Sequence, residues 1–233
     1  MTRARGFTLI EMAIVLVIIT LLIGGLAMPL SAQIQARRIA ETNKTLEEAR
    51  EALTGYAMTH RTLVGNKPYL PCPDSNGDGI EDARTANKCP QQIGYLPWVT
   101  LGAGAQDAWG NRLRYATNTD VSNDNPGIDS SVSANSSWNQ VCSSHTCTTG
   151  NIASNVPVVI VSMGPNGWGA LNVNGNTLAA PSGADELENQ DGDNIFVSRS
   201  PTKPGDPSGE FDDLVTWISY TVLTARVCPS PSC

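Results

Sequence analysis

The sequence predicts an α+β protein in which one long N-terminal α-helix packs on a small antiparallel β-sheet head with disulfide-bonded loops. Three observations lead to this prediction: an apolar segment that continues into an amphipathic helical pattern, a later region of short strand-like runs between turn residues, and six cysteines in sequence-local pairs. With 233 residues, 40% of them hydrophobic and 16% charged, the chain is long enough for one sizeable core. We therefore expect one globular domain with a helical extension.

The N-terminal segment has the composition of a membrane helix. Arg3 and Arg5 precede an apolar run from Phe7 to Leu30 in which Glu11 is the only charged residue. From Met12 onward the run carries no charge, and it meets the length of about 18–20 residues that a helix needs to cross the hydrocarbon layer. The arginines predict a cytoplasmic N-terminus and export of everything after Leu30.

An ordinary secretory signal peptide is the alternative interpretation of this segment. It also combines a positive start with an apolar centre, and either Ala27 or Ala32 then precedes the cleavage point. This alternative leaves Glu11 unexplained. A carboxylate at the edge of a membrane segment costs on the order of 2 kcal/mol or more, so it is normally kept for a function and a partner.

The segment Gly6-Phe7-Thr8-Leu9-Ile10-Glu11, followed by the apolar run, resembles the class III signal of type IV prepilins and pseudopilins. The resemblance implies that a membrane aspartyl peptidase removes residues 1–6 as a leader, cutting between Gly6 and Phe7, and that the new amine of Phe7 is methylated. It also implies an assembly role for Glu11. Its carboxylate would neutralise the N-terminal amine of a neighbouring subunit in a low-dielectric layer, which sets register and drives extraction from the bilayer.

The pattern after the apolar run is that of an amphipathic helix. Apolar residues recur at intervals of three, four or seven, at Ile39, Leu46, Ala49, Leu53 and Tyr56. Residues 7–30 are thus predicted to form the membrane and filament-core half of one helix, and residues 31–61 its amphipathic half. Together they would extend roughly 80 Å. Pro29 predicts a kink or, as the alternative, the end of the membrane helix.

Residues 62–233 are predicted to form an exported head made of strands and loops. The composition shifts after residue 61 to glycine, proline and small polar residues with short apolar runs. The best strand candidates are Leu113–Thr117, Val158–Met163, Ile195–Val197 and Leu214–Leu223. The polar stretch from Thr119 to Gly150 is expected to be a surface excursion.

The cysteines are typical of disulfides in an oxidising compartment. They are Cys72, Cys89, Cys142, Cys147, Cys228 and Cys233. Pairing of sequence neighbours is the preferred choice among the 15 arrangements that six cysteines allow. A zinc site is the alternative, but the chain has no CxxC spacing and only His60 and His145 as histidine ligands.

Two stretches of the head resemble the major pseudopilin of type II secretion. They are Asp107-Ala108-Trp109-Gly110-Asn111 with the strand that follows, and Ser162–Gly167 together with Phe211–Val215. In that family a loop ending in paired aspartates binds calcium, which implies a calcium site at Asp212 and Asp213. The intervening segment, residues 168–210, is longer here than the family's loop.

A second acidic cluster resembles the start of an EF-hand calcium loop, with side-chain oxygens at positions 1, 3, 5 and 9, glycine at position 6 and a backbone carbonyl at position 7. The predicted ligands are Asp74, Asn76, Asp78, Ile80 and Asp82. Thr85 stands at position 12, where an EF-hand has its glutamate, so the loop is incomplete. The alternative is that aspartate, asparagine and glycine serve here only as turn formers.

Charge and motifs limit the classes of function. The formal net charge of −7 argues against a nucleic-acid-binding protein, and neither His60 nor His145 lies in a nucleophile or metalloprotease motif. The resemblance implies a structural subunit of a type IV pilus-like filament, not an enzyme. Its expected partners are other pilin or pseudopilin subunits, prepilin peptidase and an inner-membrane assembly platform. Such a subunit passes once through a bacterial inner membrane before assembly and belongs to a periplasmic or extracellular filament afterwards.

The head leaves the type of subunit open. Its insertions and extra cysteines favour a minor pilin or pseudopilin. The region around Cys228 and Cys233 resembles type IVa pilins, whereas the segment at Asp107 resembles secretion pseudopilins. The alternatives are a filament-tip adhesin or substrate-binding head that uses Thr119–Gly150, and a membrane-anchored enzyme outside the cytoplasm.

Overall fold

The computed structural model describes residues 8–129, 134, 137–147, 149–228 and 233, with no description of the side chains of residues 24–29. The predicted cleavage site between Gly6 and Phe7 and the side chain of Pro29 therefore lie outside the described residues. By its internal contacts the chain divides into two compact units, residues 1–40 and residues 41–233. Helix α1 (Leu9–Thr59) contributes to both. The prediction of one long continuous helix is thus confirmed, and the helix ends at Thr59, two residues before the predicted end at residue 61.

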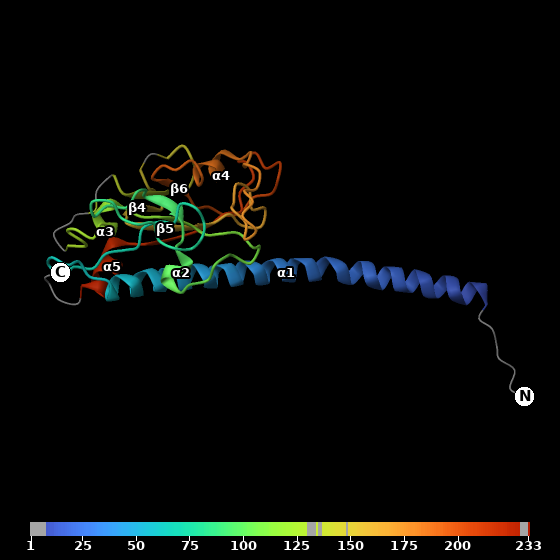
Figure 1. The fold of residues 1–233 in the computed structure, drawn as a ribbon. Coiled ribbons are helices and arrows are strands. Elements are labelled where there is room, and N and C mark those ends of the chain that lie inside the picture. The colour runs from blue at the N-terminus through green and yellow to red at the C-terminus, as the bar shows by residue number, and fades with distance from the viewer. Residues whose placement is uncertain (1–7, 130–133, 135–136, 148, 229–232) are drawn as a thin grey trace, which may run out of the picture. The chain divides into compact units, whose positions relative to one another are not determined.

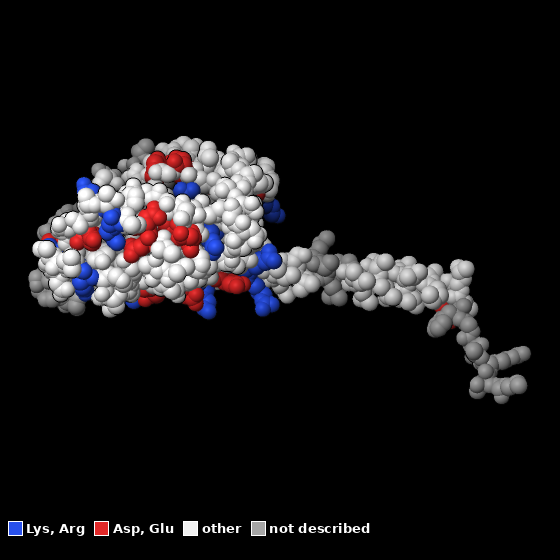
Figure 2. Space-filling model, viewed as in Figure 1, with Lys and Arg blue, Asp and Glu red and all other residues white. Residues whose placement is uncertain are grey.

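The described start of the N-terminal unit, residues 9–23, is an apolar segment of α1. The large apolar side chains from Leu9 to Ile23 are between 43% and 90% exposed. In the view of Figure 2 the segment presents mostly uncharged side chains, whereas lysine, arginine, aspartate and glutamate gather on the head. No helix in the described part of the chain reaches the length and hydropathy required for crossing a membrane.

A four-stranded antiparallel sheet forms the centre of the head (Figure 1). Its strands, in spatial order, are β1 (Ile93–Tyr95), β2 (Arg114–Ala116), β5 (Val158–Ser162) and β7 (Leu214–Ile218). The predictions for β2 and β5 are confirmed. The strand predicted over 214–223 is too long, because the chain leaves the sheet after Ile218 and forms helix α5 (Tyr220–Val227), which buries Leu223 and Val227 one helical turn apart.

A second, three-stranded sheet has the order β4 (Ala153–Val156), β3 (Asn139–Cys142) and β6 (Ile195–Val197). Strand β3 pairs antiparallel with β4 and parallel with β6. The prediction of a surface excursion over Thr119–Gly150 is therefore wrong, since this stretch holds helix α3 (Thr119–Ser122) and the fully buried β3.

The polar composition of residues 119–150 does not indicate the buried strand β3 that they contain. The side chain of Gln140 donates to the Trp138 carbonyl and to Asn155 Oδ1, and it accepts from the Gly150 N–H, so its burial leaves its polar groups paired.

The first sheet has an apolar core on each face, and this is why β5 reads as a continuous apolar run. On one face Val158 and Ile160 pack with Leu53 and other residues of α1, and on the other Val159 and Val161 pack with Phe196 of β6. The second half of α1 lies along the sheet in Figure 1. Helices α2 (Trp98–Leu101) and α4 (Ala184–Glu188) complete the head. The α+β class, with a long helix on an antiparallel sheet, is confirmed.

The three predicted disulfides are confirmed: Cys72–Cys89, Cys142–Cys147 and Cys228–Cys233. The first closes a loop of 17 residues, and a loop of this size stabilises a fold by about 3 kcal/mol in the chain-entropy model. Within this loop Glu81 accepts hydrogen bonds from Tyr56 of α1, from the Cys72 N–H and from Arg84. The disulfide and Glu81 together hold the loop against α1.

The segment Asp107–Asn111 has a structural role. The buried carboxylate of Asp107 accepts the N–H groups of Trp109 and Asn111, both at 2.9 Å, and the hydroxyl of Ser162 in β5 at 2.7 Å. The Ala108 N–H donates to the buried Thr42 hydroxyl of α1. The segment thus ties one tight turn to the sheet and to the helix.

Replacing Asp107 with alanine is expected to destabilise the head by about 2–3 kcal/mol, because it leaves two buried donors and one half-buried donor without their acceptor. Urea unfolding of the full chain in detergent, followed by tryptophan fluorescence, measures the change. Asp206→Ala is the control, since Asp206 also accepts an N–H and a hydroxyl, both from Ser208, but is exposed. Equal stability of the two variants would contradict the assigned role.

Candidate functional site

Three carboxylates from separate parts of the chain converge in the head. Glu186 comes from α4, and Asp212 and Asp213 come from the segment just before β7. One oxygen of each lies within 4.8 Å of the others. Glu186 and Asp213 are buried, and Asp212 is half-buried. We call these three residues the acidic site.

Neighbouring amides hold the acidic site in place. Asn166 donates its side-chain amide to Glu186 Oε1 at 2.9 Å and its backbone N–H to Asp212 Oδ2 at 3.1 Å. Glu186 Oε1 also accepts the Asp212 N–H at 3.0 Å. The buried Asn189 donates to Asp213 Oδ2 at 2.8 Å. Every carboxylate of the site therefore has one oxygen fixed by a hydrogen bond.

Two further oxygens of the site are buried and have no hydrogen-bond partner in the described structure, namely Glu186 Oε2 and Asp212 Oδ1. A buried acceptor without a donor costs about 1–3 kcal/mol, so this arrangement requires an explanation. The absence of a side chain at Gly164 leaves room for Asp212 in this arrangement. A Cβ at this position would lie 2.4 Å from Asp212 Oδ1 and 2.1 Å from the Asp212 carbonyl oxygen.

The electrostatics of the site disfavour three negative charges. Burial and then the charge of Glu186 raise the pKa of Asp212 to about 7. Burial likewise raises the pKa of Asp213 well above its usual value, and it raises the pKa of Glu186. A cation would reverse these shifts, because it stabilises the ionised carboxylates.

The donor set fits a hard divalent cation. Ca²⁺ takes six to eight oxygen ligands from carboxylates, carbonyls and water, and three carboxylates with two unpaired buried oxygens offer this chemistry. Of the two predicted ligands, Asp212 and Asp213, the structure brings both to the site. Sequence reasoning missed Glu186, which is 26 residues away from Asp212. Its only signal was its place in an acidic stretch of the long intervening segment.

The other predicted calcium loop is built from turns. Asp74 is buried, and its carboxylate accepts the N–H groups of Asn76, Gly77 and Gly79 at 2.6–3.0 Å. Asp78 accepts from Asn76 and from the Ile80 N–H, and Asp82 accepts from the Ser75 N–H. Calcium binding by this loop stays a prediction.

Glu11 lies in the first turn of α1 and pairs there with Thr8. The Thr8 N–H and hydroxyl both donate to Glu11 Oε2 at 2.8 Å, and the Glu11 N–H donates to the Thr8 hydroxyl at 3.3 Å. This reciprocal pattern is a capping box, which satisfies free N–H groups at the start of a helix. The carboxylate is exposed, so it is open to a further partner.

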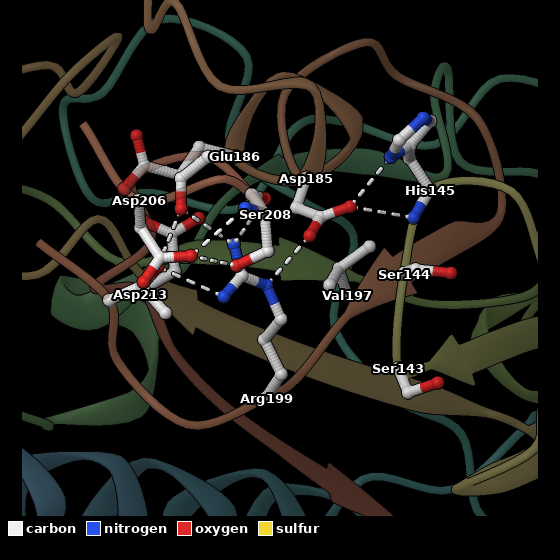
Figure 3. Close-up of polar contacts among 12 residues, drawn as sticks. Ser143, Ser144, His145, Asp185, Glu186, Val197, Arg199, Asp206, Ser208 and Asp213 are labelled. Carbon is white, nitrogen blue, oxygen red and sulfur yellow. Dashed lines mark hydrogen bonds and ion pairs between the residues drawn. The ribbon is translucent and has the colours of Figure 1, made fainter. Parts of the chain in front are cut away.

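The side chain of His145 contacts a carboxylate and does not contact a hydroxyl or thiol that could act as a nucleophile in the described structure. Its Nδ1 lies 2.7 Å from Asp185 Oδ1, and Asp185 Oδ2 lies 2.6 Å from Arg199 Nε (Figure 3). The hydroxyl of the adjacent Ser144 bonds to Thr146. In the described structure His145, Asp185 and Arg199 form a hydrogen-bonded chain next to the acidic site.

Comparison with known proteins bears on the N-terminal segment. Residues 1–27 match the family model described as the prokaryotic N-terminal methylation motif, the signal of type IV pilins and pseudopilins. The match includes Gly6, Phe7 and Glu11, and it confirms the resemblance inferred for this segment. Such a motif is typical of type IV pilin-like and pseudopilin subunits, which prepilin peptidase processes and which assemble with other pilin subunits. No curated protein and no solved structure matches the chain.

Proposed function

We propose that the chain is a minor pilin or pseudopilin of a type IV pilus-like filament. Its precursor spans the bacterial inner membrane once through residues 7–30, with the head outside the cytoplasm. Prepilin peptidase cuts between Gly6 and Phe7, the amine of Phe7 is methylated, and an inner-membrane platform packs the subunits helix to helix. The observation that carries this proposal is the methylation motif with Glu11 placed in it.

The exposed apolar surface of α1 supports the same function. Its described side chains from Leu9 to Ile23 are apolar apart from Glu11 and Thr20, and the Thr20 hydroxyl bonds to carbonyls of its own helix. Such a surface requires lipid or other apolar helices around it. A membrane provides this environment before assembly, and neighbouring subunits provide it in a filament.

We further propose that the acidic site binds Ca²⁺. The support comes from its three clustered carboxylates, its two unpaired buried oxygens and its raised pKa values. The cation would supply positive charge that connects α4 to the start of β7. Calorimetric titration of the full chain in detergent gives the number of sites. One site is expected if only the acidic site binds, and two if the loop from Asp74 to Asp82 also binds.

A cavity favours a second candidate function, a ligand-binding head at a filament tip. Its volume is about 460 Å³, within the range of small-molecule sites, and its lining includes Arg61, Tyr69, Asn87, Asp124 and Asn125. Under this alternative, Tyr69→Ala would abolish adherence while filaments remain. Deleting Thr119–Gly150 would not discriminate, because it removes the buried strand β3.

A further inference from the structure

We propose that the Cys142–Cys147 loop is a positioning element of the acidic site, and that its disulfide sets the affinity of this site for Ca²⁺. The inference rests on the calcium function proposed above. It adds a group of residues that touch the carboxylates of the site or their neighbours. Two separate chains of contacts lead from the disulfide loop to two of the three carboxylates.

The first chain of contacts leads to Glu186. Within the disulfide loop, the His145 N–H donates to Asp185 Oδ1 at 2.9 Å, and His145 Nδ1 lies 2.7 Å from the same oxygen. Asp185 directly precedes Glu186 in α4. Figure 3 shows the Asp185 carboxylate between His145 and Arg199. The loop therefore holds α4 at the residue next to a proposed calcium ligand.

Arg199 holds Asp185 from the other side. Its Nε lies 2.6 Å from Asp185 Oδ2, its Nη2 donates to the carbonyls of Ser208 and Gly209, and its guanidinium lies 4.6 Å from the centre of the Phe211 ring. Phe211 directly precedes Asp212. The Asp185 carboxylate thus accepts hydrogen bonds from the disulfide loop on one side and from Arg199 on the other.

The second chain of contacts leads to Asp213. Cys142 ends β3 and pairs with Val197 of β6, and its carbonyl accepts the Ser198 N–H at 2.8 Å. The buried Asn189 bonds to both the N–H and the carbonyl of Val197, at 2.7 and 3.1 Å, and its amide also donates to Asp213 Oδ2. The strand that carries the disulfide therefore reaches a second carboxylate through one asparagine.

These contacts matter because α4 cannot hold its own position. It has five residues, far fewer than a helix needs for stability in isolation, so its place depends on tertiary contacts. A disulfide keeps a short loop ordered at low entropic cost. Substituting residues that hydrogen-bond to metal ligands commonly weakens metal binding by about ten- to a hundredfold. Because disulfides form in oxidising compartments, the site would gain full affinity only after export of the head.

The test compares two disulfides of equal loop length. In the full chain in detergent, titrated calorimetrically with CaCl₂, Cys142→Ser with Cys147→Ser is expected to weaken calcium binding roughly ten- to a hundredfold. Cys228→Ser with Cys233→Ser is the control, because it opens a loop of the same sequence separation, 5, beside α5 and the α1 core. The control is expected to bind as the parent does. His145→Ala, which keeps the disulfide, is expected to weaken binding in the same direction.

Hydrogen exchange of the α4 amides without calcium provides a second readout. Exchange is expected to accelerate in the Cys142/Cys147 and His145 variants and to stay unchanged in the control. Parent-like affinity and exchange in both loop variants would overturn the inference while leaving the calcium site in place. A parent chain that binds no calcium would instead refute the proposed site and the affinity claim together, and the exchange rates would still report whether the loop holds α4.

Discussion

Replacing Glu11 with glutamine is expected to abolish filament assembly while the precursor is still inserted and cleaved. The carboxylate and the N-terminal amine created by cleavage attract each other strongly in a low-dielectric layer, and removing one charge leaves the other without compensation. Glutamine is the informative substitution because it keeps an oxygen that can accept from Thr8, so the capping box survives. The sheared extracellular fraction and electron micrographs would measure filaments, and membrane fractions would measure the subunit pool.

Glu48→Ala is the matched control in the same helix. Glu48 is exposed and pairs with Lys44 at 3.5 Å, an arrangement that contributes at most a few tenths of a kcal/mol. This variant is expected to assemble normally. If Glu11→Gln assembled as many filaments as the parent, charge pairing would have no part in assembly.

Calcium is expected to raise the thermal unfolding midpoint of the head by roughly 5–10 °C at a hundredfold excess over the dissociation constant. Binding at that excess stabilises the folded state by about 2.7 kcal/mol, and 1 kcal/mol corresponds to about 2–4 °C for a domain of this size. Glu186→Gln and Asp212→Asn are expected to remove the response. The exposed Asp191, which clusters with Glu188 and Asp193, provides the control: Asp191→Asn is expected to retain the response. An equal calcium response in all three variants would place the cation elsewhere.

The same site predicts opposite pH dependences with and without calcium. In the metal-free protein the pKa of Asp212 is about 7, whereas an unfolded aspartate has a pKa near 3.9, so the folded state binds the proton more tightly. The contribution of Asp212 to the free energy of unfolding is therefore fully present below about pH 4 and is lost as pH rises through 7. Bound calcium requires the ionised carboxylate, so calcium affinity rises over the same range.

Unfolding midpoints at pH 5 and pH 8, with calcium and with chelator, measure these two dependences. The parent is compared with Asp212→Asn to isolate this one group. At pH 8, where Asp212 is ionised, the difference between the two unfolding midpoints is expected to change sign on adding calcium. A difference that is independent of pH in the chelated protein would show that Asp212 does not carry the shifted proton.

The sequence was informative wherever a periodic pattern determined the structure. Helix α1 followed from apolar spacing, and β5 followed from its run of β-branched residues. Helix α5 was mistaken for a strand because Tyr220, Thr221 and Val222 favour strands by composition, whereas packing of Leu223 and Val227 on the core decides the conformation. Strand β3 escaped notice because it contains Gln140, a polar residue whose side chain is paired by partners that only the folded chain supplies.

The sites divide in the same way. Glu11 and the residues around it form a continuous motif, so the sequence alone identified them. The acidic site is discontinuous, and only the packing of α4 against the segment before β7 brings Glu186 to Asp212 and Asp213. The disulfide pairs could be predicted because each joins cysteines that are sequence neighbours among the six.

Mass spectrometry of the N-terminal peptide of the mature protein, isolated from cells, tests the central claim most directly. A filament subunit retains its apolar helix, so we predict that the mature chain begins at Phe7, that its α-amine carries a methyl group and that Glu11 is present. A mature chain that begins at Met28 or Gln33, with the apolar segment removed, would identify that segment as an ordinary signal peptide and contradict the account.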